Sequence, residues 1–268
     1  MRTLLITGAT SGIGLEAAMQ LARNGDKLIL VGRDPGKLRD AQQRVPGSDT
    51  LQADFASQAS VRKLAADING RYDHIDVLVN NAGTVFARRT LTEDGIESTF
   101  AVNHLAAFLL TGLIKDRITE RIVNVSSVAH YNATMDFDDL GFEHGYQVMR
   151  AYGRSKLANV MFTRSLAKRV DGVTVNAVHP GAVATSIWSH APWFARPVLA
   201  IMKRTSMDSP EEGAKHITYL AVSPDVADSN GLYFDDDKPR EPSALARDDA
   251  VAERLWTESE RLTSADRD

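Results

Sequence analysis

Short apolar runs alternate with longer helical patterns along almost the whole chain, and this alternation is what most constrains the fold. The runs are rich in Val, Ile and Leu and are nearly continuous, which is typical of strands buried on both faces of a parallel sheet. The helical patterns between them supply the crossover connections that parallel strands need. We therefore predict an α/β protein with a doubly wound parallel sheet of about seven strands and helices on both faces. The expected strands are 3–7, 27–31, 50–54, 75–83, 121–127, 173–181 and 231–234.

Two segments interrupt this rhythm: a polar, irregular one at 128–150 after the fifth expected strand, and one at 185–208 after the sixth that carries two tryptophans and a phenylalanine. Insertions at the ends of parallel strands are where α/β proteins build ligand sites. We find no internal repeat or linker and predict a single domain over 1–268, with a substrate lid near 185–208. Large apolar residues inside that lid could instead pack on the protein's own core, form a dimer contact or touch a membrane surface; they are Trp188, Trp193, Phe194, Leu199, Ile201 and Met202.

Composition excludes several classes of protein. A net charge of −4 and a pI near 6.0 give no reason to expect a nucleic-acid partner. The absence of cysteine excludes disulfides and thiolate metal sites, and it fits a reducing cytoplasm. The seven histidines show no ligand-like spacing, so no metal is expected. Because no uninterrupted apolar stretch reaches the length of a membrane span and no signal peptide is evident, we expect a cytoplasmic protein without a membrane span.

A glycine-rich turn, TGATSGIG at 7–14, stands between the first expected strand and the first expected helix. Glycine clusters occur in many tight turns, and such a turn alone is weak support for a ligand site. At a strand-to-helix crossover, however, the backbone N–H groups and the helix N-terminus can bind a pyrophosphate. The turn therefore predicts nucleotide binding; its candidate residues are Gly8, Thr10, Ser11, Gly12, Ile13 and Gly14.

The end of the second expected strand bears on which dinucleotide binds. A site that prefers NAD usually has an acidic residue there, which binds the ribose 2′-hydroxyl. This chain has Gly32 followed by Arg33, and a guanidinium binds a 2′-phosphate well. We therefore predict NADP(H), although Arg33 could simply begin an exposed loop while Asp34 takes the role of the acid.

Tyr152 and Lys156 stand four residues apart in YGRSK at the start of a helical pattern. On a helix this spacing brings a phenol and an ammonium group to one face. An isolated pair of this kind usually marks a solvent-exposed face. A phenol beside a positive charge can also exchange its proton more readily, which is useful in general acid–base catalysis.

The set of motifs resembles the classical short-chain dehydrogenases/reductases, over essentially the whole chain and in the expected order. The motifs are TGxxxGIG at 7–14, NNAG at 80–83, Asn103, NVSS at 124–127, YGRSK at 152–156 and HPGAVAT at 179–185. The segment from 209 to 236 and the long spacing between Ser127 and Tyr152 resemble the retinol-dehydrogenase-like branch. The resemblance implies a Rossmann-like fold and pairing into a homodimer or homotetramer through helices near 92–114 and 152–170.

The resemblance also implies roles for single residues. Tyr152 would be the general acid/base, Lys156 would tune it and bind the nicotinamide ribose, and Ser127, preferred over its neighbour Ser126, would bind the substrate oxygen. Asn103 would bind a water that connects Lys156 to solvent. Cofactor contacts would come from Asp54, Phe55, Asn81, Ala82, Gly83, Pro180, Gly181, Val183 and Thr185.

The predicted function is an NADP(H)-dependent oxidoreductase that interconverts a lipophilic alcohol and its aldehyde or ketone. Two alternatives stay open. The first is a non-catalytic NADP-binding regulator or sensor on the same fold. The second is a reductase of the same family whose substrate is a steroid, a polyketide or a protochlorophyllide-like ring.

Overall fold

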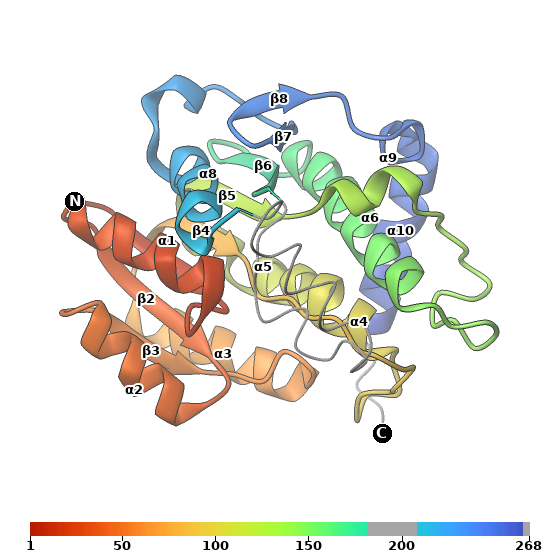
Figure 1. Cartoon of the computed structure of the whole chain (residues 1–268), viewed down its shortest axis with the longest axis horizontal. Helices are drawn as coiled ribbons and strands as arrows, with labels where there is room; N and C mark the ends of the chain where they lie inside the picture. The colour runs from red at the N-terminus through yellow and green to blue at the C-terminus, as the bar shows by residue number, and fades with distance from the viewer. Residues whose placement is uncertain (182–207, 265–268) are drawn as a thin grey trace.

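The protein forms one eight-stranded sheet at its centre, seen in a computed structural model that describes residues 1–181 and 208–264 (Figure 1). The strand order is β3-β2-β1-β4-β5-β6-β7-β8, and every neighbouring pair is parallel except β7 and β8. The strands are β1 (Thr3–Thr7), β2 (Lys27–Gly32), β3 (Asp49–Gln52), β4 (Ile75–Asn80), β5 (Ile118–Val125), β6 (Thr174–His179), β7 (Tyr233–Asp235) and β8 (Lys238–Arg240). The predicted doubly wound parallel sheet is confirmed.

The strand count differs from the predicted seven by β8. This strand is a three-residue, fully exposed antiparallel addition at the sheet edge, and its Lys-Pro-Arg sequence has no apolar run. Its charge and its proline suit an edge strand that must not pair with another chain. The sequence therefore carried no strand signal at this place.

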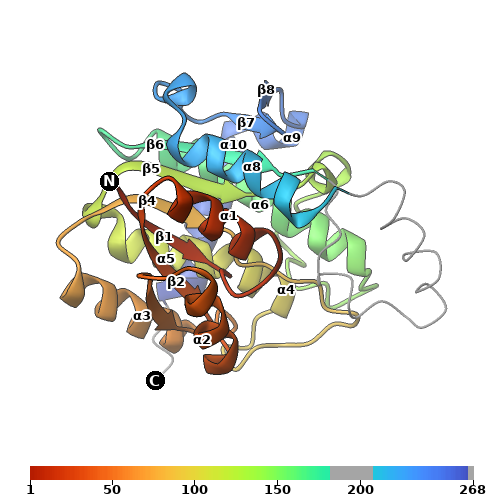
Figure 2. The ribbon, with the colours of Figure 1, turned by 60° about the vertical axis from the view of Figure 1, so that its left-hand side comes forward.

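Helices cover both faces of the sheet (Figure 2). Leu4 and Ile6 of β1 pack with α1 and α8 on one face, whereas Leu5 packs with α3, α5 and α6 on the other. Because adjacent residues of one strand point to opposite faces, burial on both faces requires the continuous apolar runs of the sequence. The main helices are α1 (Gly12–Arg23), α2 (Pro35–Arg44), α3 (Gln58–Arg71), α4 (Ser98–Phe100), α5 (Ala106–Ile114), α6 (Val148–Ala167), α8 (Pro210–Val222), α9 (Ala244–Arg247) and α10 (Asp249–Ser264).

The C-terminal helix α10 packs against α6 and the start of α5. Trp256 of α10 lies with its ring centroid 5.0 Å from that of Phe108 and 6.0 Å from that of Phe162. Fourteen of the twenty residues of α6 are buried, because α10, β6 and the turn Val128–Asn132 all pack on this helix. Pairing of subunits through α6 stays a prediction. Such pairing would use a helix that α10 already covers in part.

One stretch, Ser98–Arg117, is long and apolar enough to cross a membrane by length and composition, and 72% of it is buried inside the fold. Its apolar character is explained by packing against α3 and α6. The predicted lid at 185–208 lies, apart from Asp208, outside the described residues, as do Val183 and Thr185.

Candidate active site

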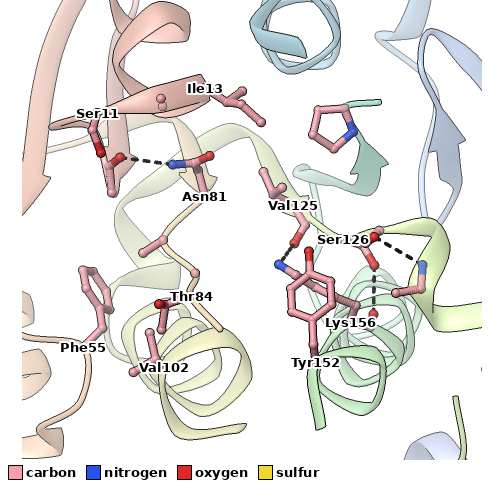
Figure 3. Close-up of a pocket in the computed structure, with 18 of the residues that line it drawn as sticks. Ser11, Ile13, Phe55, Asn81, Thr84, Val102, Val125, Ser126, Tyr152 and Lys156 are labelled. Atoms are coloured by element: carbon pink, nitrogen blue, oxygen red, sulfur yellow. Dashed lines mark hydrogen bonds between the residues drawn. The ribbon is translucent and has the colours of Figure 1, made fainter. Parts of the chain in front are cut away.

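The carboxyl ends of the central strands open onto a cleft of about 670 Å³, which is large enough for a cofactor and a substrate (Figure 3). Its walls run from the glycine turn after β1, past the ends of β2 and β4, to the start of α6. The cleft brings together nearly all predicted site residues within the described chain: Gly8, Thr10, Ser11, Gly12, Ile13, Gly14, Arg33, Asp54, Phe55, Asn81, Ala82, Gly83, Ser127, Tyr152, Lys156, Pro180 and Gly181.

The glycine turn has little space for any side chain. Gly8 has φ +67°, and a Cβ there would lie 2.9 Å from the Cα of Ala82. Asn81 ties this turn to β4, because its Nδ2 donates to the carbonyl of Thr7 at 2.8 Å while the Thr7 hydroxyl accepts from the N–H groups of Asn81 and Ala82. The turn leads into the N-terminus of α1, where free backbone N–H groups favour an anion. These residues therefore fit the pyrophosphate of a dinucleotide.

The end of β2 forms one edge of the cleft. A Cβ on Gly32 would lie 2.3 Å from Cγ2 of Thr10, so any larger residue at this position requires the Thr10 side chain to move. Arg33 follows with a side chain that is 74% exposed, and its guanidinium lies 4.0 Å from the carboxylate of Asp54. Asp34 instead accepts a hydrogen bond from the N–H of Lys37 and caps α2. The alternative role of Asp34 as the ribose-binding acid therefore competes with this capping bond.

Tyr152 and Lys156 face each other across one turn of α6, with the Lys156 Nζ 5.6 Å from the centroid of the Tyr152 ring. Lys156 is only 3% exposed, and its Nζ donates to the carbonyl of Val125 at 3.0 Å. Burial lowers the pKa of Lys156 to about 8. Burial also raises the pKa of Tyr152, and a hydrogen bond with Ser127 opposes that rise. The pair is therefore a buried amine beside a half-buried phenol, and not a solvent-exposed helix face.

The two serines at the end of β5 have different surroundings. Ser126 Oγ donates to the carbonyl of Lys156 at 2.8 Å, which commits its proton to α6. Ser127 Oγ accepts from the N–H of Ala129 at 3.2 Å and faces the Tyr152 hydroxyl. Of these two serines, Ser127 is therefore the better placed to donate to a ligand, and its role in binding the substrate oxygen stays a prediction.

Asn103 lies just behind the cleft on a π-helical turn, Ala101–Leu105, between α4 and α5. Its Oδ1 accepts from the N–H of Thr84 at 2.8 Å, and its Nδ2 donates to the Thr84 carbonyl and to Ser155 Oγ, both at 3.0 Å. A Cβ on Gly83 would lie 3.4 Å from Asn103 Oδ1 and 3.5 Å from Lys156 Nζ. Asn103 and Lys156 thus face the same space beside Gly83, in which a Cβ would make ordinary van der Waals contacts.

Several residues that no sequence motif marks also line the cleft. Val128 and Met149 are 43% and 49% exposed, unusual values for large apolar side chains beside a cleft. Phe86 and Val102 also line the cleft, and Figure 3 shows Val102 beside Thr84 and Phe55. The sequence did not predict that Val128 and Met149 line a cleft, because both lie among polar residues and the cleft forms only when distant segments meet.

Comparison with known proteins decides the family. Residues 2–192 match the family model described as short chain dehydrogenase. The chain belongs to the short-chain dehydrogenase/reductase family. Within this family it falls in the retinol-dehydrogenase-like branch: it is 41% identical to human retinol dehydrogenase 13 over 97% of this chain and 84% of that protein. It is 38% identical to mouse polyprenol dehydrogenase over 98% of this chain and 84% of that protein.

Solved structures of this short-chain dehydrogenase/reductase fold agree with the architecture. A protein from Mycobacterium paratuberculosis superposes with a TM-score of 0.82 at 32% identity, covering 99% of this chain and 94% of its own. A variant of actinorhodin polyketide ketoreductase with NADPH superposes with a TM-score of 0.67 at 28% identity, covering 87% of this chain and 95% of its own. The predicted family and fold are confirmed, and the chain is an oxidoreductase of this family.

Proposed function

We propose that this oxidoreductase uses NADP(H) to interconvert a lipophilic alcohol and its aldehyde or ketone, with Tyr152 as the general acid/base. The observation that carries the proposal is the position of Tyr152, Lys156 and Ser127 together at one end of the cleft whose other end is the glycine turn. We further propose a cytoplasmic location, which is supported by the absence of cysteine.

The preference for NADP(H) rests on the end of β2. A 2′-phosphate at this edge would meet the exposed guanidinium of Arg33, whereas the acid that typically selects NAD is replaced by Gly32 in this chain. The polyketide ketoreductase with NADPH, a structural relative of this chain, supports the same choice. A bound nicotinamide would supply or accept the hydride.

The residues of the site suit reduction of a carbonyl. When hydride adds to the carbonyl carbon, negative charge develops on oxygen and a proton must reach it. Ser127 can donate a hydrogen bond to that oxygen, and Tyr152 can transfer its phenolic proton. The phenolate that remains is stabilised by the ammonium of Lys156. We retain for Asn103 a water-mediated path to Lys156, supported by the space that both share beside Gly83.

The lipophilic substrate class is supported by the apolar wall beside Tyr152. Val128 follows Ser127 and Met149 lies three residues before Tyr152 on α6, and both are exposed apolar side chains that line the cleft. The names of two relatives, a retinol dehydrogenase and a polyprenol dehydrogenase, refer to long apolar alcohols. Reduction is the direction that we favour, because NADPH is the proposed cofactor and the phenol of Tyr152 holds the proton that the product oxygen needs.

The test is a fluorescence titration of the purified protein with NADPH and NADH, followed by a panel of aldehydes and ketones of increasing chain length. We expect tighter binding of NADPH than of NADH and turnover that improves with apolar length. Binding of NADPH without turnover across the whole panel would favour the regulator or sensor. Turnover restricted to steroid, polyketide or cyclic tetrapyrrole substrates would favour the other alternative.

A further inference from the structure

Asn159 lies three residues after Lys156 on α6, and it is 4% exposed. Its Nδ2 donates to the carbonyl of Asn103 at 3.0 Å and to that of Val125 at 3.2 Å. The second of these carbonyls is the one that also accepts the Nζ of Lys156. Asn159 therefore joins the end of β5, the π-helical turn and α6 at the point where Lys156 is held.

A buried chain of hydrogen bonds continues behind Asn159 to the C-terminal helix. His104, which is 0% exposed, lies with Nδ1 3.3 Å from Asn159 Oδ1 and with Nε2 2.9 Å from the Oγ of Ser259 on α10. Burial lowers the pKa of His104 to about 4, so the ring is neutral at neutral pH. The ring is packed between the aromatic rings of Phe100, Phe108 and Phe162.

The donor and the acceptor of each hydrogen bond in this network follow from the two bonds that Asn159 makes to backbone carbonyls. Backbone carbonyls only accept, so the NH₂ of Asn159 must face Asn103 and Val125, and its Oδ1 must face His104. His104 must then carry its proton on Nδ1, and Nε2 must accept the hydroxyl proton of Ser259. One arrangement satisfies every group, which fixes the orientation of the Asn159 amide.

We propose that Asn159 is a positioning residue for Lys156: it shares the Val125 carbonyl with the lysine and holds the Asn103 turn, while His104 and Ser259 orient its amide. The proposal rests on the proposed function for its effect on catalysis. Because two donors share one carbonyl oxygen, neither has the acceptor to itself. The buried ammonium of Lys156 is thus less stabilised than it would be with Val125 alone.

Few other groups act on Lys156 in the described part of the chain. Burial is the one cause that lowers its pKa, with no contribution from a carboxylate or a second cation. The titratable groups that face it are Tyr152 on α6 and, beyond Asn159, His104 on the π-helical turn. A change in the pKa of Lys156 after mutation of Asn159 would therefore report on the shared carbonyl.

The test replaces Asn159 by leucine. The control is Asn176→Leu on β6, since Asn176 is 5% exposed and also bonds two backbone groups, the carbonyl of Ser229 and the N–H of Leu232. The pKa of Lys156 is followed by NMR of its side-chain ¹³Cε and ¹⁵Nζ in the ligand-free protein, with Lys156→Met to assign the signal. His104→Phe, which keeps an aromatic ring among its aromatic neighbours, is a second test variant if Asn159→Leu does not fold.

We expect the pKa of Lys156 to rise by half a unit or more in Asn159→Leu, less in His104→Phe, and not at all in Asn176→Leu. In turnover, kcat should fall at least tenfold in Asn159→Leu, with the Kd for NADPH changed less than threefold. An unchanged pKa in both test variants, or a kcat loss no larger than that of the control, would overturn the proposal. If the wild-type protein itself shows no turnover, the proposed function fails while the NMR titration still decides the positioning role.

Discussion

Lys156 lies with its ammonium 5.6 Å from the Tyr152 ring centroid and is held there by the carbonyl of Val125, with 3% of the residue exposed. The fold thus buries a cation in its core, one helical turn from a phenol. Burying an amine costs free energy unless its charge is paired and hydrogen-bonded. Within the described residues, the one hydrogen bond of Lys156 Nζ goes to a neutral carbonyl, so its burial lowers its pKa.

Tyr152→Phe should lower kcat by about a hundredfold or more, because the proton that a general acid supplies typically contributes ~10²–10⁴ in rate. The Kd for NADPH should change little, since only the hydroxyl is lost. Steady-state kinetics and fluorescence titration measure the two quantities. Tyr131→Phe is the control, because the Tyr131 hydroxyl bonds the carbonyl of Glu241 outside the cleft. Retention of more than a few per cent of activity would show that another group supplies the proton.

Lys156→Met should inactivate the enzyme yet stabilise the fold at pH 7. The folded pKa of about 8 lies below the ordinary 10.5, so the unfolded chain binds the proton more tightly. The resulting penalty on the wild type is fully present below about pH 8 and disappears as pH rises toward 10.5. We expect a gain of about 1–3 kcal/mol at pH 7 that shrinks at pH 9.

Urea unfolding of wild type and Lys156→Met at pH 7, 8 and 9 measures this gain. The exposed Lys115→Met serves as the control, with no pH-dependent gain expected. If Lys156→Met is less stable than wild type at pH 7, the hydrogen bond and packing of the lysine contribute more to the free energy of unfolding than its desolvation costs.

Arg33→Ala should weaken NADPH binding roughly 10- to 100-fold, since a hydrogen bond to a charged group contributes about 1.5–3 kcal/mol. NADH, which has no 2′-phosphate, should bind with nearly unchanged Kd. The matched control is Arg23→Ala at the C-terminal end of α1, which removes an equal charge away from the cleft. Equal losses for NADPH and NADH would indicate that Arg33 has a structural role alone.

Arg154→Met should raise the KM for an apolar carbonyl several-fold without changing the Kd for NADPH. Arg154 is 2% exposed and donates to the carbonyls of Thr134, Asp139 and Leu140, and its guanidinium stacks 3.7 Å from the Phe142 ring centroid. It thereby holds the segment between β5 and α6, which lines the cleft nearer its start, at Val128, Ala129 and Asn132.

Removal of these bonds to a charged group should cost about 2–4 kcal/mol of stability. Arg150→Met provides the comparison. Arg150 lies one turn earlier on α6, is exposed, and has its guanidinium 5.8 Å from the Phe142 ring centroid, farther than that of Arg154. The prediction is wrong if Arg150→Met and Arg154→Met have the same KM and the same unfolding midpoint.

The sequence by itself determined the parts of this protein that depend on local pattern. Continuous Val, Ile and Leu runs require burial on both faces, so the parallel sheet follows from them. The glycine turn follows from its place between β1 and α1, and the Tyr152–Lys156 pair from helical spacing. These features need no knowledge of distant residues.

Tertiary structure decided the rest, because hydrogen-bond partners and burial depend on segments that meet only after folding. Ser126 and Ser127 are identical in sequence terms, and the carbonyl of Lys156 is what commits Ser126 and leaves Ser127 free to donate. β8 exists only because β7 provides an edge for it. The chain from Ser259 through His104 to Asn159 joins residues up to 155 positions apart, and no periodicity in the sequence could report it.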